Sequence, residues 1–226
     1  VQKRWVAERD GRVAGYAFCF RNFFTEGSTN AFGGVTVAEM HRRRGIGTAL
    51  HEQVDAHARA LGAGSITVHF LENAAGVSFA PGLGYREARA EQESVLDPRT
   101  IAERPPPGLD LRRVLDVDPR HVYEVDVTAT RDVPLLEPVD HIPYAEWEDH
   151  VLRHPLFTSD GSFLAYVDGA PAAVSLLIAD SESRRAANMF TGTLPAFRGR
   201  GLGLAVKLAS IDWAAASGIT AMVTTN

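Results

Sequence analysis

The sequence has little cysteine and no long apolar run. Cys19 is the only cysteine, which excludes a disulfide within the chain and favours a reducing compartment such as the cytoplasm. No apolar stretch approaches the roughly 20 residues that span a bilayer, and no signal peptide is visible. We therefore expect a cytoplasmic protein without a membrane partner.

An excess of positive charge is also missing. The 226 residues include 23 Lys and Arg against 28 Asp and Glu, a formal net charge of −5. Domains that bind nucleic acid usually carry a basic patch on a basic background, so we expect no nucleic-acid partner. Hydrophobic residues make up 45% of the chain, which is enough for a packed core. This composition indicates one large or two small globular domains.

The sequence contains two similar glycine-rich stretches, "HRRRGIGTAL" (41–50) and "FRGRGLGLAV" (197–206). Neither has the Gly-Lys-Ser/Thr of a P-loop. A dinucleotide fingerprint needs a third glycine where the chain has Leu50 and Val206. A single copy is also explained as a helix that starts at glycine beside solvated arginines. The second copy, in the same context, argues against that interpretation.

The two stretches belong to an internal repeat. Gly45 corresponds to Gly201, an offset of 156 (201 − 45), and a stop glycine follows 17 residues later at Gly62 and at Gly218. An amphipathic run fills each interval, and the strand patterns "ITVHF" and "ITAMV" come next, each ending near an asparagine. We interpret this as a duplicated domain.

A run of three prolines marks the boundary between the repeats. Residues 105–107 favour an extended spacer, so the predicted domains are 1–104 and 108–226. Only 44 residues precede Gly45 and only 25 follow Gly201. We therefore expect the first domain to lack its beginning and the second its end, in a native chain longer than this sequence.

Turn and strand patterns indicate the fold class. Asp-Gly pairs at 10–11 and 168–169 predict β-hairpins, because this pair supplies the positive φ of a tight turn. A further strand leads into each glycine stretch. A strand and two helices, "PRHVYEVDVTA" and "YAEWEDHVLRH", precede the second hairpin. The order predicts an α+β fold with two tandem domains, each a mostly antiparallel mixed sheet flanked by helices.

The glycine stretches have the features of an anion site. A helix N-terminus has four unpaired backbone N–H groups and about half a positive charge. Glycines let a ligand approach these amides, and arginines add bidentate donors. We predict that both stretches bind phosphate.

The order of these elements resembles the acetyl-CoA-binding core of the GNAT superfamily of N-acetyltransferases. In this order, a strand leads into Arg-x-x-Gly-x-Gly, an amphipathic helix follows, and the next strand ends at Asn. The duplication makes the chain similar to tandem two-domain members of the mycothiol synthase type. The resemblance implies acetyl-CoA (coenzyme A) as co-substrate, no metal, and a primary amine of a small molecule or peptide as acceptor. The cofactor-binding residues it implies in the first domain are Val35, Val37, Arg42, Arg43, Arg44, Gly45, Ile46, Gly47, Thr48 and Asn73. In the second domain they are Thr191, Thr193, Arg198, Gly199, Arg200, Gly201, Leu202, Gly203, Leu204 and Asn226.

The resemblance also implies roles. The amides after each glycine would bind the pyrophosphate, the strand edges would pair with the pantetheine arm, and the asparagines would flank that arm. The backbone N–H of Val35 or Thr191 would stabilise the oxyanion. The amine attacks the thioester, a base takes its proton, and an acid protonates the leaving thiolate.

The first domain departs from the family at both proton-transfer positions. The usual tyrosine acid is replaced by Ala80, and Pro81 is expected to end the local helix. Tyr85 is expected to pack in the core. The position of the strand carboxylate holds Ala31, and Ala187 in the second domain. The general base and acid therefore stay unknown.

Other candidates carry little weight. His69 and Glu72 are possible bases, but such groups are usually solvated or structural. Acidic residues in the loop 130–144, Asp132 among them, either attract an amine or are simply solvated. We expect the second domain to be catalytic and the first to bind the cofactor or to be degenerate. The alternative is a non-catalytic acetyl-CoA-binding module with a regulatory or structural role.

Overall fold

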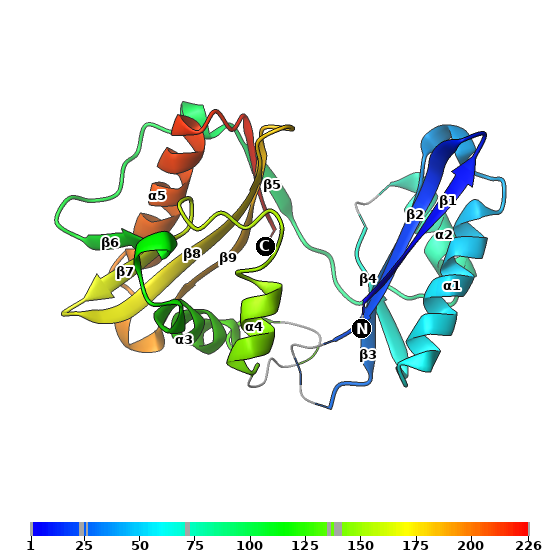
Figure 1. Ribbon diagram of the computed structural model, residues 1–226, viewed down its shortest axis with the longest axis horizontal. Helices are drawn as coiled ribbons and strands as arrows, with labels where there is room; N and C mark the ends of the chain where they lie inside the picture. Colours follow the sequence, from blue (N-terminus) through cyan, green and yellow to red (C-terminus); the bar gives the residue numbers. More distant parts are fainter. Residues whose placement is uncertain are drawn as a thin grey trace. The chain divides into compact units, whose positions relative to one another are not determined.

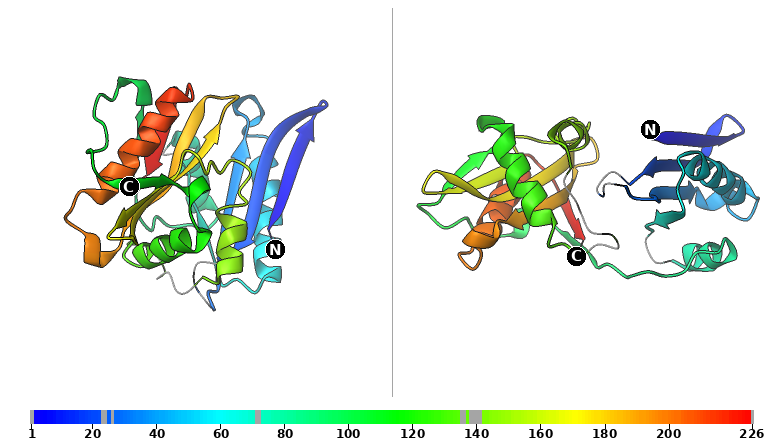
Figure 2. Two further views of the ribbon diagram at one scale, coloured as in Figure 1. Left: turned by 60° about the vertical axis from the view of Figure 1, so that its left-hand side comes forward. Right: turned by 90° about the horizontal axis from the view of Figure 1, so that it is seen from below.

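The computed structural model describes residues 2–22, 25, 27–70, 73–134, 137 and 142–225. The chain divides into two compact units, residues 1–88 (unit 1) and residues 89–226 (unit 2). Each unit is a mixed, mostly antiparallel sheet flanked by helices (Figures 1 and 2). The predicted α+β fold class is confirmed.

Unit 1 contains a four-stranded sheet in the order β1-β2-β3-β4. Its strands are β1 (Lys3–Arg9), β2 (Arg12–Arg21), β3 (Asn30–Val37) and β4 (Ser65–Val68). The predicted hairpin joins β1 and β2, and both of its turn residues, Asp10 and Gly11, have positive φ. This is the backbone of a tight hairpin turn whose twist matches that of the strands. Among these four strands, β4 runs parallel to β3, and the other neighbouring pairs are antiparallel.

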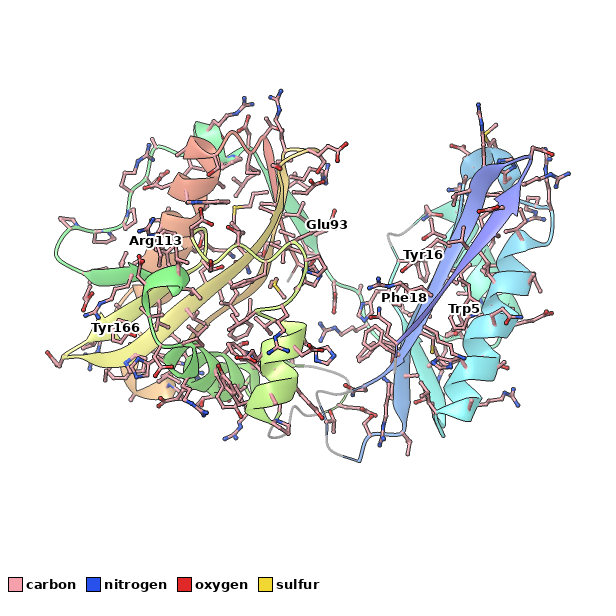
Figure 3. All side chains as sticks on the ribbon, viewed as in Figure 1. Trp5, Tyr16, Phe18, Glu93, Arg113 and Tyr166 are labelled. Atoms are coloured by element: carbon pink, nitrogen blue, oxygen red, sulfur yellow. The ribbon has the colours of Figure 1, made fainter. Side chains whose placement is uncertain are left out.

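One face of this sheet is covered by α1 (Ile46–Ala60), which follows the short 3-10 helix η1 (Glu39–His41). Val54 and Leu50 of α1 lie in one buried cluster with Cys19, which is fully buried. Figure 3 shows Trp5 on the α1 side of the sheet and Tyr16 and Phe18 on the other side. This alternation is the period of two that places neighbouring strand residues on opposite faces.

The helix α2 (Ala74–Gly82) follows β4 and continues through Pro81. The sequence predicted that Pro81 ends this helix, and the structure places the end one residue later. The last turn is closed by Leu83 N to Ala80 O and Gly84 N to Pro81 O, both at 3.0 Å, and neither bond needs the N–H that proline lacks.

Unit 2 contains a six-stranded sheet in the order β5-β10-β9-β8-β7-β6. Its strands are β5 (Glu93–Leu96), β6 (Asp110–Arg113), β7 (Phe163–Val167), β8 (Ala170–Asp180), β9 (Arg185–Thr193) and β10 (Ala221–Thr225). The pair β9 and β10 is parallel and the others are antiparallel. The hairpin β7–β8 turns at Asp168 and Gly169, both at positive φ as predicted.

Helices cover both faces of the second sheet. They are α3 (Pro119–Thr130), α4 (Tyr144–His150) and α5 (Leu202–Ala216), with 3-10 turns η2 (Pro98–Thr100), η3 (Val114–Asp116) and η4 (Pro195–Phe197). Gly192 of β9 faces α3, where an added Cβ would lie 2.6 Å from the Cβ of Ala129. Its neighbour Thr193 faces Gly203 of α5. The helix α4 ends at His150, before the end that the sequence predicted.

The division between the units lies ahead of the proline run. β5 pairs antiparallel with β10, and Leu96 and Ile101 pack against a buried cluster that includes Leu208 and Ile211 of α5. Residues 89–104, which the sequence boundary assigned to the first domain, therefore pack in unit 2. The prolines at 105–107 lie within unit 2.

The internal repeat is visible in the local geometry. α1 and α5 have the same length, 15 residues each. Both end at a glycine with left-handed φ, 75° at Gly62 and 76° at Gly218. In each, the next N–H bonds back to a carbonyl of the last turn, Ala63 N to Ala58 O at 2.9 Å and Ile219 N to Ala214 O at 3.0 Å. These are the C-terminal glycine motifs that the stop signals predicted.

Candidate functional site: two glycine loops and the opened strand edge

The first site feature is a pair of helix N-termini without side-chain caps. α1 begins after Gly45 and α5 after Gly201, and both glycines are left-handed, with φ of 79° and 74°. No side chain of the described residues caps either helix, whereas Asn73 caps α2 and Asp118 caps α3. The first amides of α1 and α5 are therefore left for a ligand or for water.

A second left-handed residue precedes each of these glycines by two positions. It is Arg43 in unit 1, with φ of 60°, and Gly199 in unit 2, with φ of 75°. Left-handed residues in such a turn make successive N–H groups converge into a concavity that suits an anion. The two loops have the same backbone, although unit 1 forms it with an arginine that is strained there.

One arginine in each loop hydrogen-bonds to the end of the strand that precedes the loop. Arg42 Nε donates to Val37 O, and Arg198 Nε donates to Thr193 O, both at 3.1 Å. Arg198 also forms an ion pair with Asp132. Asp132 therefore contacts the glycine loop through an ion pair whose two side chains are both about half exposed.

The other arginines are directed outward. Arg43 and Arg44 are exposed and make no hydrogen bond or ion pair within the described part of the chain. Arg200 lies with its guanidinium carbon 5.6 Å from the centre of the Phe197 ring. These are the side chains of the loops that can reach an external phosphate.

The second glycine of each loop provides space beside the preceding strand. A Cβ at Gly203 would lie 3.1 Å from Thr193 Oγ1, and one at Gly47 would lie 3.3 Å from the Phe79 ring. The helix N-terminus therefore lies directly against the end of the strand, at Thr193 in unit 2. A larger residue at either position would press against this neighbour.

The strands that lead into the loops have one open edge. In unit 2, β9 and β10 pair only as far as Ala187 and Val223, and β10 continues alone with β5. A β-bulge interrupts the β8–β9 pairing between Leu176 and Leu177, leaving Met189 as the extra residue. Among the described residues, no strand pairs with the other edge of 189–193. This edge presents the backbone donors and acceptors that an extended amide ligand needs.

In unit 1, the strand that leads into the glycine loop also has an unpaired edge among the described residues, but this strand has no bulge. Pairing of β3 with β4 ends at Gly33 and Val68, so the edge at Val35 and Val37 is open within the described chain. The β2–β3 register runs without interruption from Gly15 to Arg21. The two open edges therefore differ in shape at the end farther from the glycine loop.

A buried polar chain lies at the bulge of unit 2. Ser210 Oγ on α5 donates to Ser175 Oγ at 3.1 Å, and Asn188 Oδ1 accepts from Thr191 Oγ1 at 2.9 Å and lies 3.4 Å from Ser175 Oγ. Ser175 and Ser210 are fully buried. Sequence reasoning missed this chain, although comparing the repeats position by position would have shown Val54 opposite Ser210.

Asn73, the asparagine predicted to flank the ligand in unit 1, caps a helix. Asn73 Oδ1 accepts a hydrogen bond from Gly76 N at 2.9 Å and so caps α2. Its counterpart Asn226 and the candidate base Glu72 lie outside the described residues. His69 packs against Phe32, with ring centres 6.3 Å apart.

Tyr85 lies beside the second turn of α1. Its hydroxyl lies 3.1 Å from His51 Nε2 and the two rings meet edge to face. Burial, the largest cause, raises the pKa of Tyr85 to about 12, which makes it a poor proton donor to a thiolate at neutral pH. Tyr85 is partly buried against His51, and its role in core packing stays a prediction.

A buried carboxyl group lies between α3 and α4. Asp126 accepts hydrogen bonds from Trp147 Nε1 at 2.6 Å and from Thr130 Oγ1 at 3.2 Å. Burial raises its pKa to about 6, against the opposing effect of these two donors. No cation pairs with it in the described part of the chain.

The described residues contain no helix long and apolar enough to cross a membrane. They also contain no cluster of three or more His, Cys, Asp or Glu that would hold a metal ion. His150, which the sequence places one helical turn from His154, has its Nδ1 2.7 Å from Glu146 O.

Comparison with known proteins gives the same repeated pattern. The family model described as "Acetyltransferase (GNAT) family" matches residues 2–85 and 122–226. A tandem GNAT protein from the clavulanic acid biosynthesis pathway superposes with a TM-score of 0.70 at 22% identity, over 100% of this chain and 74% of that one. A GCN5-related N-acetyltransferase from Sphaerobacter thermophilus superposes with 0.67 at 18%, over 96% and 69%. No curated protein matches the sequence significantly.

Proposed function

Because the chain belongs to the acetyltransferase (GNAT) family, we propose that it transfers an acetyl group from acetyl-CoA to a primary amine of a small molecule or peptide. The observation that carries this proposal is the pair of uncapped, glycine-started helices beside open strand edges. The bent edge of unit 2, with its bulge at Met189, favours unit 2 as the catalytic half. Unit 1 would bind the cofactor or be degenerate.

Each part of the site would have a distinct task. The amides of residues 199–204, with Arg200, would bind the pyrophosphate, because a helix N-terminus and convergent N–H groups favour negative charge. The open edge at Thr191 and Thr193 would pair with the amides of the pantetheine arm. The Thr191 amide would stabilise the oxyanion formed when the amine attacks. In unit 1, the corresponding groups are residues 43–48 and the edge at Val35 and Val37.

The reaction needs two proton transfers. The amine nitrogen forms a bond to the thioester carbon, the carbon–sulfur bond breaks, and the amine proton passes to a base while the thiolate gains a proton. Asp126 is too deeply buried to receive the amine proton directly. Water at the open edge is the simplest acceptor for a proton from an amine that arrives deprotonated.

The second candidate is a non-catalytic acetyl-CoA-binding module. One observation favours it for unit 1, where α2 has Ala80 at the position of the usual acid and Tyr85 is held by His51. It would leave unit 1 able to bind the cofactor without catalysing transfer.

Calorimetric titration of the full-length protein with acetyl-CoA tests both candidates. We expect binding, with Gly203→Leu abolishing the unit 2 site and Gly47→Leu serving as the matched change in unit 1. Leucine is a good helix former, so each change acts mainly through the bulk it adds where the helix begins beside the strand or α2. Two sites per chain would show that both loops bind. One site, lost only in Gly203→Leu, would leave unit 2 as the working half, and no binding would reject the proposed function.

A further inference from the structure

The polar chain of unit 2 fixes the orientation of one carboxamide. A carboxamide oxygen accepts two hydrogen bonds well, and the hydroxyls of Thr191 and Ser175 lie within reach of Asn188 Oδ1 at 2.9 and 3.4 Å. The Ser210 hydroxyl donates to Ser175 Oγ, which orients the Ser175 proton toward Asn188. The Nδ2 end of the Asn188 side chain therefore faces away from these three hydroxyl groups.

That nitrogen end is free to bind a ligand. Asn188 Nδ2 has two N–H donors, and within the described residues neither has a hydrogen-bond partner. Asn188 is half-buried, so its side chain is still accessible from outside.

Asn188 also lies where the sheet opens. Pairing of β9 with β10 ends at the preceding residue, Ala187, and the bulge at Met189 follows immediately. An extended ligand on the open edge of 189–193 would meet Asn188 at its inner end. The side chain is thus placed at the end of the edge that lies farthest from the glycine loop.

Unit 1 has none of these polar groups. Val54 stands in place of Ser210 and Val35 in place of Thr191, at the repeat offset of the sequence. By strand pairing, Ala17 takes the place of Ser175 and Gly33 that of Asn188. The arrangement is therefore a special feature of unit 2 and not a requirement of the repeated fold.

We propose that Asn188 is a ligand-binding residue of unit 2, whose Nδ2 group donates to a carbonyl oxygen of the acyl-pantetheine arm of acetyl-CoA. Thr191, Ser175 and Ser210 are positioning residues that keep the carboxamide in the donating orientation. This inference rests on the proposed function. It also explains why a buried hydroxyl chain, which an apolar core does not need, occurs only in the unit with the bulge.

The test uses the full-length protein carrying Gly47→Leu, which silences unit 1, and titrates it with acetyl-CoA in a calorimeter. Asn188→Asp keeps the oxygen that accepts from the hydroxyls but replaces the donor by an acceptor, so we expect affinity to fall at least about tenfold, the equivalent of one hydrogen bond. Asn188→Leu removes the donor without adding charge and should lose a similar amount. Thr191→Val should weaken binding about threefold through loss of orientation, and Thr191→Ser should restore it.

The control is Thr220→Val, which removes a hydroxyl bonded to Arg184 O elsewhere in unit 2 and should leave affinity unchanged. Thermal unfolding of each variant separates loss of binding from loss of fold. Wild-type affinity in both Asn188 variants overturns the inference, as does an equal loss in Thr191→Val and Thr191→Ser. If the protein without a substitution at 188 or 191 binds no acetyl-CoA in either unit, the proposed function fails, and this inference with it.

Discussion

At the residue scale, the buried carboxyl group of Asp126 lowers the stability of unit 2 at neutral pH. Its carboxyl group is buried against Trp147 with a pKa near 6, whereas an unfolded aspartate ionises near 4. Between these values the folded state binds more protons than the unfolded state. The free energy of unfolding should therefore fall as the pH rises from about 4 to 6 and stay lower above that range.

Asp126→Asn should remove this penalty and keep an oxygen for Trp147 Nε1. We expect the variant to gain up to about 3 kcal/mol in the free energy of unfolding at pH 7.5, and little at pH 4, where the wild-type group is already protonated. Urea unfolding at the two pH values measures this. Glu124→Gln, on the exposed side of α3, controls for removing one negative charge, and an equal gain at both pH values would contradict the prediction.

At the element scale, the two glycine loops show how one backbone is built by two sequences. Arg43 and Gly199 occupy the same left-handed position. Gly199→Arg should therefore fold but lower the free energy of unfolding by about 1 kcal/mol. The left-handed φ costs a residue with a Cβ about 1–2 kcal/mol. Part of this cost is offset because glycine loses more conformational entropy than arginine when the chain folds.

Denaturant unfolding measures this cost. No atom lies within 4 Å of a Cβ added at Gly199, so the backbone angle is the only source of strain. Gly82→Ala, at ordinary φ and equally open, should instead leave stability unchanged or raised, since alanine favours helix. A Gly199→Arg protein as stable as wild type would show that the loop relaxes without strain.

The sequence predicted the elements whose signals are local. Asp-Gly turns, glycine stops and the repeat offset placed the hairpins and the ends of α1 and α5, because each depends on neighbouring residues. The bulge at Met189 and the orientation of Asn188 were not predicted, because both depend on pairing with β8 and on contacts with α5. β5 was missed for the same reason: its four residues have a partner, β10, that lies more than half the chain away.

At the scale of the whole molecule, the position of β5 decides where unit 2 begins. A fragment of residues 108–226 lacks β5, the buried Pro98, and the packing of Leu96 and Ile101 on α5. A fragment of residues 89–226 keeps them. We expect the shorter fragment to be less stable by at least about 3 kcal/mol, from two lost apolar side chains at 1.5–3 kcal/mol each.

Thermal and urea unfolding of the two fragments, side by side, measures this difference. The longer fragment should also resist proteolysis within β10, whose edge β5 covers. Equal unfolding midpoints would show that β5 adds nothing to unit 2 and would favour a boundary at the proline run.

The pairing of β5 with β10 also sets an order of events during synthesis. Residues near 95 leave the ribosome long before those near 223, so β5 has no partner until nearly all of unit 2 has been made. Contacts between such distant segments form slowly, and unit 1 can complete its own sheet in the meantime. The pairing of β10 with both β9 and β5 would then come late among the strands of this sheet, and the sheet would not assemble strand by strand in chain order.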